Sequence, residues 1–167
     1  SEPVPCPSCG MALEQNTVTF EESPNPELEE MTRRFWAGAL LACPVFLLAM
    51  TEMVLGSRME EFVNRTLSNC VQLVFATPVV LWTGFPFFAR GWASIINRSP
   101  NMFTLIAIGV GSAYLYSLGA TLTPQLFPAG FQRNGNVEPY FDTSVVIIVL
   151  VLLGQVLELR ARYQTGS

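Results

Sequence analysis

The chain contains no histidine and no lysine, and all nine of its basic residues are arginines. Thirteen acidic residues give a formal net charge of −4, so we expect no nucleic-acid partner. Zinc in structural sites is usually held by four cysteine and histidine ligands. With four cysteines spread along the chain and no histidine, a complete zinc site within this sequence is disfavoured.

Charge of either sign is scarce, because charged residues make up 13% of the chain and hydrophobic residues 50%. This composition is typical of a small membrane protein with several spans rather than of a soluble domain. Four segments lack charge and approach the length needed to cross a bilayer, namely residues 35–51, 66–89, 100–122 and 143–157. We predict an all-α membrane protein with four transmembrane helices, at about residues 32–54, 68–98, 101–122 and 140–160.

Residues 1–30 are polar and acidic, and they are too few to bury a core of their own. We predict that they form a tail ahead of a membrane region over residues 31–162. The tail has no apolar stretch of the kind found in a cleavable signal peptide. Six arginines flank the span ends on the side of the termini: Arg33, Arg34, Arg90, Arg98, Arg160 and Arg162. By the positive-inside rule, we expect both termini in the cytoplasm.

The second span is irregular, because Pro78, Gly84 and Pro86 all lie within it. Proline removes a helical hydrogen bond, so we predict a kink at about residues 83–86. Beyond the kink, apolar side chains share one helical face: Phe88, Trp92, Ile95 and Ile96. This pattern predicts an amphipathic helix that lies in the cytoplasmic interface. The alternative is a helix end with ordinary aromatic and arginine anchors.

Carboxylates close both ends of the fourth span, at Asp142 and Glu158. The two lie roughly 24 Å apart along a helix and about 160° apart around its axis, so they cannot bind one ion together. A carboxylate at the edge of the hydrocarbon layer is unfavourable unless a cation visits it, which indicates ion movement. The alternatives are a Glu158 paired with Arg160 or Arg162 and an Asp142 that is simply tolerated at a span end.

Soft metal ligands occur at two places. Met102 begins the third span, and a thioether selects Cu(I) over hard cations, although a methionine here also serves as core filler. Cys6 and Cys9 are spaced so that both thiolates can reach one ion. They form either a labile Cu(I) site or the remnant of a degenerate metal-binding sequence.

Several segments carry a resemblance to a known family, above all Asn101-Met102-Phe103-Thr104, Tyr140-Phe141-Asp142 and the stretch from Leu152 to Leu159. Together with residues 32–50, 81–88 and 91–94, they closely resemble the N-terminal membrane part of copper-transporting heavy-metal P-type ATPases, the type IB pumps. The likeness runs from about residue 28 to the final residue. Cys6 to Leu13 also resembles the back half of a small heavy-metal-binding module that often precedes such pumps.

The resemblance implies roles for matching residues. Met102 and Glu158 correspond to the methionine and the carboxylate of the cytoplasmic copper-uptake site. Asp142 stands where the family has an acidic residue on the exit route. The kinked second span corresponds to a docking platform for a cytoplasmic copper donor, with the four platform residues Thr83, Gly84, Arg90 and Arg98; the family's Gly-Gly kink here reads Thr83-Gly84.

The function implied is that of a segment of an ATPase pump that exports Cu(I) from the cytoplasm, in a bacterial inner membrane. Such a pump couples export to ATP hydrolysis, with ATP and Mg²⁺ bound only by the full-length protein. The partners implied are the bilayer and the remaining pump domains, and residues 163–167 would begin the actuator domain. Two alternatives are a free-standing copper-binding membrane subunit and a membrane thiol–disulfide carrier that uses Cys6 and Cys9.

Overall fold

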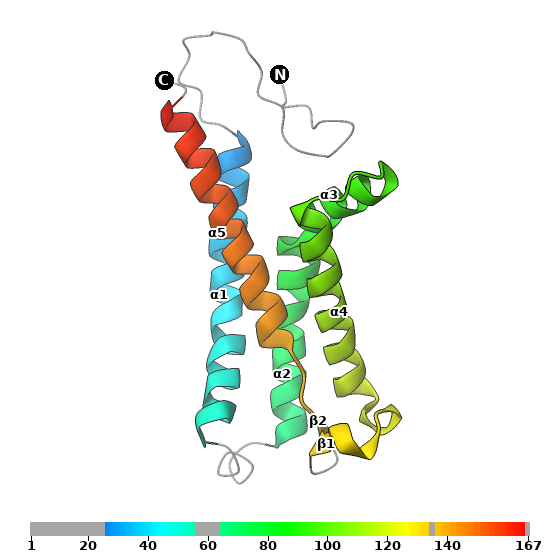
Figure 1. Ribbon diagram of the computed structural model, residues 1–167. Coiled ribbons are helices and arrows are strands. Elements are labelled where there is room, and N and C mark those ends of the chain that lie inside the picture. Colours follow the sequence, from blue (N-terminus) through cyan, green and yellow to red (C-terminus); the bar gives the residue numbers. More distant parts are fainter. Residues whose placement is uncertain (1–25, 56–63, 134–135, 166–167) are drawn as a thin grey trace.

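The computed structural model describes residues 26–55, 64–133 and 136–165, and within these ranges the chain is almost entirely helical. Its long helices are α1 (Pro26–Leu55), α2 (Arg65–Pro78), α4 (Met102–Leu122) and α5 (Phe141–Thr165). A π-helical turn, η2 (Val79–Thr83), extends α2. Four helices are long and apolar enough to cross a membrane, and this confirms the predicted all-α class with four spans (Figure 1).

A separate helix, α3 (Phe85–Ile96), follows η2. Gly84 joins the two, and its N–H donates to the carbonyl of Val79 at 2.9 Å. Figure 1 shows α3 leading away from the bundle at a steep angle to α2, at the end opposite to the last turn of α1. The second span is therefore an α-helix, a π-turn and a separately directed helix in succession.

The connection from α4 to α5 is made of short pieces. It contains two 3₁₀ turns, η3 (Pro124–Leu126) and η4 (Ala129–Phe131), and two strands of two residues each, β1 (Gln132–Arg133) and β2 (Asn136–Val137). The strands pair antiparallel. The Gln132 side chain holds the turns together, because its Nε2 donates to the carbonyls of Pro124 and Phe127 at 3.1 and 2.7 Å.

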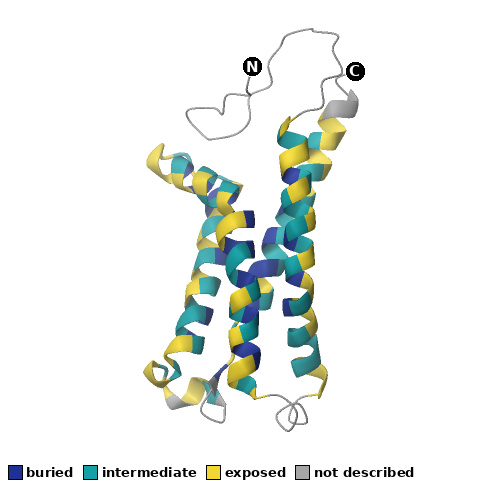
Figure 2. Cartoon of the chain, turned by 180° about the vertical axis from the view of Figure 1, so that it is seen from behind, coloured by how far each residue is buried: buried dark blue, intermediate teal, exposed yellow. Residues whose placement is uncertain are grey.

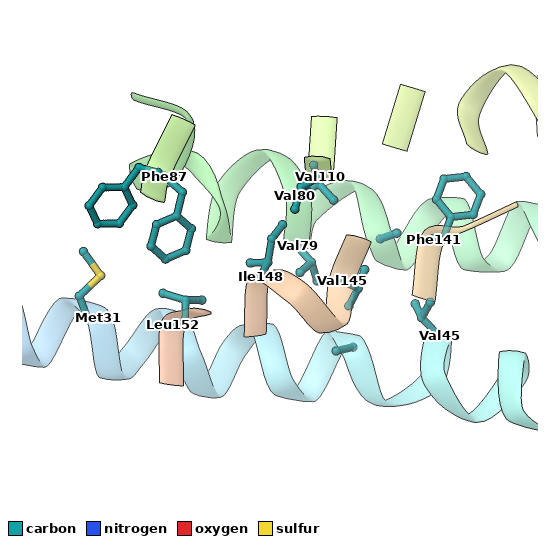
Figure 3. Packing of buried hydrophobic residues seen from close by; sticks show 13 residues of the cluster. Met31, Val45, Val79, Val80, Phe87, Val110, Phe141, Val145, Ile148 and Leu152 are labelled. Carbon is teal, nitrogen blue, oxygen red and sulfur yellow. The ribbon is translucent and has the colours of Figure 1, made fainter. Parts of the chain in front are cut away.

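The core lies between α1, α2, η2 and α5, with further side chains from α3 and α4, and Figure 3 shows these apolar side chains packed together. Fully buried members include Val45, Val79, Phe87, Ile148 and Leu152. Figure 2 shows buried positions on the inner faces of the helices and exposed positions outside. Large apolar residues such as Leu40 and Leu105, each 77% exposed, lie on that outer surface. An apolar exterior of this kind is what a bilayer requires.

Helix α5 begins well inside the bundle. A Cβ placed on Gly38 of α1 would lie 3.7 Å from the side chain of Val149, so these two positions face each other. Because the helices run antiparallel at the same rise, seven residues outward on each brings Val45 level with Asp142. Figure 3 accordingly shows Phe141 over Val45, and Figure 1 shows α5 starting above the lower ends of α1 and α2.

Candidate metal site

The carboxylate of Glu158 is already engaged within α5. Its Oε1 lies 2.9 Å from Nη2 of Arg162, one turn later on the helix, and its Oε2 accepts a hydrogen bond from Nε2 of Gln155 at 3.3 Å. The side chains of Glu158 and Arg162 are 51% and 54% exposed. An exposed ion pair between residues four apart on a helix is worth only a few tenths of a kcal/mol. The carboxylate is therefore occupied, but weakly.

Met102 is the first residue of α4, and its side chain is 58% exposed. The helix start is rigidly built, because Asn101 Oδ1 accepts hydrogen bonds from the N–H groups of Phe103 and Thr104 at 3.0 and 3.3 Å. The Thr104 hydroxyl oxygen in turn accepts a hydrogen bond from the Asn101 N–H at 3.1 Å, which completes a capping box. Thr104 also hydrogen-bonds to Ser94 of α3. The thioether thus projects from a fixed junction between α3 and α4.

The structure does not bring Met102 and Glu158 together. Figure 1 shows the last turns of α5 beside α1, whereas α4 begins beneath α3 on the other side of the bundle. Within the described residues there is also no group of three or more cysteine, aspartate or glutamate side chains that could hold a metal ion. The two candidate ligands share the same end of the molecule but not one coordination shell.

Arg90, predicted as a platform residue, turns inward instead of lying free on a docking surface. Its Nη2 is 2.8 Å from Oε1 of Glu27 on α1, and its Nη1 donates to Oε1 of Gln155 on α5 at 3.4 Å. Its guanidinium lies 5.4 Å from the ring centroid of Phe103 on α4. The side chains of Arg90 and Glu27 are only 20% and 16% exposed. Arg90 therefore joins α3 to α1, α4 and α5. Its partner Gln155 also hydrogen-bonds to Glu158.

Sequence reasoning missed two members of this end of the bundle. Glu27 falls within the acidic residues 1–30, and its pairing with Arg90 spans 63 residues, which no local pattern reveals. Met31, one turn after Glu27, is 4% exposed, and Figure 3 shows it near Leu152 and Phe87. The spacing of Glu27 and Met31 on one helical face was the available signal.

Thr83 and Gly84, also predicted as platform residues, are buried. Thr83 is 0% exposed, and its hydroxyl has no hydrogen-bond partner among the described residues. A Cβ on Gly84 would come within 2.7 Å of the Val80 carbonyl and 2.9 Å of the Ile148 side chain. Gly84 therefore permits the close approach of η2 to α5. Both residues lie in the buried junction between η2 and α3, not on the exposed surface of α3.

Arg98 lies in the turn between α3 and α4, is exposed, and has a left-handed φ of 52°. The N–H of Ser99, the residue after Arg98, donates to the Ser94 carbonyl at 3.0 Å. Arg98 therefore occupies the position at the end of a helix that favours glycine. Of the platform residues, it alone is placed where a partner could reach it.

Asp142 lies in the first turn of α5 and is half-buried. Within the part of the chain that the structure describes, no hydrogen bond or ion pair to its side chain is found. Cys6 and Cys9 lie outside the described residues. The other two cysteines, Cys43 and Cys70, are free and exposed on the outer surfaces of α1 and α2.

Comparison with known proteins gives the same family as the resemblance. The chain is 52% identical over 167 residues to a copper-transporting P-type ATPase of Rhizobium leguminosarum and 51% identical over 168 residues to a copper-exporting P-type ATPase of Legionella pneumophila. It is 52% identical over 172 residues to a silver exporting P-type ATPase of Salmonella typhimurium. The chain is homologous to the N-terminal membrane region of metal-exporting P-type ATPases.

These matches cover 99 to 100% of the chain but only 20 to 22% of each relative. The chain thus spans about one fifth of the length of the curated relatives it matches. No family model matches the chain. The chain is therefore similar over its whole length to one part of metal-transporting P-type ATPases, and four of its helices are long and apolar enough to cross a membrane.

Proposed function

We propose that this chain is the N-terminal transmembrane segment of a pump that exports Cu(I) from the cytoplasm, and that it supplies the copper-uptake site. The observation that carries the proposal is the identity of about one half, over the whole chain, to two copper pumps and one silver pump. Cu(I) and Ag(I) are both soft monovalent ions, for which a thioether is a suitable ligand. Met102 offers an exposed thioether at the end of the bundle that the arginines assign to the cytoplasm.

Because Met102 and Glu158 lie apart, we propose that they bind copper in succession. Met102 captures the soft ion at the junction of α3 and α4. Glu158 then attracts its charge toward α5, once Arg162 has been displaced. The Glu158–Arg162 pair is about half exposed, so its rupture costs no more than about 1 kcal/mol. A transfer site must release what it binds, and a weakly held carboxylate suits that task.

Helix α3 is proposed as the platform for a cytoplasmic copper donor. Its inner face packs on α4 through Gly91, where a Cβ would lie 2.8 Å from the Phe103 carbonyl. Its outer face exposes Trp92 and Ile96, at 66% and 64%. An apolar stripe on a helix at the membrane boundary is typical of an interfacial helix. Arg98, at its end, is the arginine we expect a donor protein to contact.

In the full-length pump, ATP and Mg²⁺ bind to domains outside this chain and supply the energy for export. Asp142 is proposed to meet copper on the exit side, and Cys6 and Cys9 to bind copper in a regulatory role. Both termini are proposed to lie in the cytoplasm of a bacterial cell.

The test is the copper-stimulated ATPase activity of the full-length pump, measured across free Cu(I). We expect Met102→Leu and Glu158→Gln each to raise the half-maximal Cu(I) concentration about tenfold, which corresponds to ~1.4 kcal/mol of binding free energy. Matched controls lie at the other end of the bundle. Met53→Leu changes a methionine that is 72% exposed, and Glu138→Gln a carboxylate paired with Arg65. Unchanged curves for Met102→Leu and Glu158→Gln would refute the uptake role.

A further inference from the structure

A second cluster of polar side chains lies at the outer end of the bundle, between the last turns of α1 and the first turns of α2. Its members are Glu52, Ser68, Asn69 and Gln72. The Ser68 hydroxyl donates to Oε1 of Glu52, and Nε2 of Gln72 donates to the same oxygen at 3.5 Å. This cluster is at the opposite end from Met102 and Glu158, and the uptake site described above does not use it.

The three α2 residues are deeply buried, with exposed fractions of 4% for Ser68, 3% for Asn69 and 2% for Gln72. They fall on one helical face, because residues three and four apart are neighbours. Within the described residues, Asn69 Oδ1 is buried and accepts no hydrogen bond. Buried polar atoms are almost always satisfied, so the unpaired Asn69 oxygen, on the helical face whose Ser68 and Gln72 bind Glu52, marks a place where a donor or a cation is missing.

We propose that Glu52, Ser68, Asn69 and Gln72 form a binding site for a hard monovalent metal cation such as Na⁺. The side chains offer one carboxylate, one hydroxyl and the amide oxygens of Asn69 and Gln72; the Gln72 amide must turn over to present its oxygen, because its Nε2 now faces Glu52. Oxygen ligands suit hard cations and not the soft Cu(I), which prefers sulfur. A single carboxylate balances one positive charge, whereas sites for divalent ions usually gather several carboxylates.

The position of the site gives it a route to the outside. Glu52 lies seven residues beyond Val45 on α1, and therefore roughly 10 Å outward from the level of Asp142. Gln72 lies one turn deeper along α2 than Ser68, so the polar face runs inward from Glu52. Charged groups on the elements packed here are Arg65 of α2, which is 2.8 Å from Glu138, and Asp142 of α5. Arg58, Glu60 and Glu61 lie in the connection between α1 and α2, outside the described residues.

The experiment is infrared difference spectroscopy on the full-length pump in lipid nanodiscs, without copper or ATP. Buffer is exchanged between NaCl and N-methylglucamine chloride at constant pH, and separately between neutral and mildly acidic solutions at constant Na⁺. We expect a carboxylate band that responds to the Na⁺ exchange at constant pH and disappears in Glu52→Gln. Glu138→Gln, which alters an exposed carboxylate at the same end, should retain this band.

Asn69→Leu keeps the carboxylate but removes the unpaired oxygen, and it should weaken the apparent cation affinity about tenfold, or ~1.4 kcal/mol. The Asn69→Leu variant also tests the site if Glu52→Gln fails to fold. A band that follows Na⁺ identifies a metal-ion site, whereas a band that follows acid alone reports protonation of the Glu52 carboxyl group and overturns the proposal. If no band is lost in Glu52→Gln, or if Asn69→Leu titrates like the unaltered protein, the site does not exist. Because copper is absent, these outcomes are independent of the uptake roles of Met102 and Glu158.

Discussion

Replacing Arg90 with methionine should loosen α3 from α1 and α5. The change removes an ion pair of 2.8 Å to Glu27, in which both side chains are about four-fifths buried, and a contact with the Phe103 ring. Breaking a fully buried pair costs about 3–5 kcal/mol and an exposed pair about 0–1, so this intermediate pair is worth about 2 kcal/mol. The ring contact adds about 0.5–1 kcal/mol. We expect a total loss of about 2–3 kcal/mol.

The assay is unfolding of the chain in mixed micelles, followed by circular dichroism as the fraction of SDS is raised. Arg162→Met is the matched control, because the Arg162–Glu158 ion pair has a similar distance, 2.9 Å, but is half exposed. This variant should lose only about 0.3–0.5 kcal/mol of unfolding free energy. A double-mutant cycle of Arg90→Met with Glu27→Gln isolates the pair itself. Equal losses of stability for the Arg90 and Arg162 variants, or a coupling energy near zero, would refute the conclusion that Arg90 holds α3 against the bundle.

Three further changes test the junction of η2 and α3, the turn and the tail. Gly84→Ala should destabilise the chain by about 1–3 kcal/mol in the same SDS titration, because the added Cβ would press on the Val80 carbonyl and on α5. Gly109→Ala is the control and should be neutral or stabilising, because the space around Gly109 is open. A larger loss for Gly109→Ala than for Gly84→Ala would contradict the close packing at Gly84. Arg98→Gly should stabilise by about 1 kcal/mol, because glycine adopts a φ of 52° without strain, and a loss of stability would count against that. Cys6→Ser with Cys9→Ser should leave the maximal copper-stimulated turnover of the full-length pump unchanged and alter only its regulation or copper affinity; a lower maximum would show that transport needs the thiols.

The four spans could be predicted because hydrocarbon imposes a simple rule on sequence. A stretch without charge, such as residues 100–122, has few ways to exist except as a helix in a bilayer, and α4 occupies nearly the same residues. The rule does not identify every residue of a span. The charge-free segment of residues 35–51 ends before Glu52, whereas α1 continues to Leu55, and the Glu52 carboxylate accepts hydrogen bonds from Ser68 and Gln72 of α2. Both donors lie in another helix.

The candidate site was predictable as a set of residues but not as an arrangement. Helical periodicity places Glu158 near Arg162, and the structure shows that pair. It cannot place Met102 relative to Glu158, because their separation depends on how α4 and α5 splay. The resemblance predicts Arg90 as a platform residue, yet its guanidinium pairs with Glu27, 63 residues earlier. Long-range pairing of this kind depends on tertiary packing, which no single segment encodes.

The recessed start of α5 changes the thickness of the barrier at that place. Residues 138–140 are not helical, although they approach a depth where α1 and α2 still are, and the Tyr140 N–H is satisfied by the Ser117 hydroxyl at 2.7 Å. Hydrocarbon cannot solvate an irregular backbone, so lipid beside this segment must give way to water or to protein. The low-dielectric path that opposes an ion is therefore shorter along α5 than along α1. A cation that travels beside α5 meets water sooner than the length of the bundle implies.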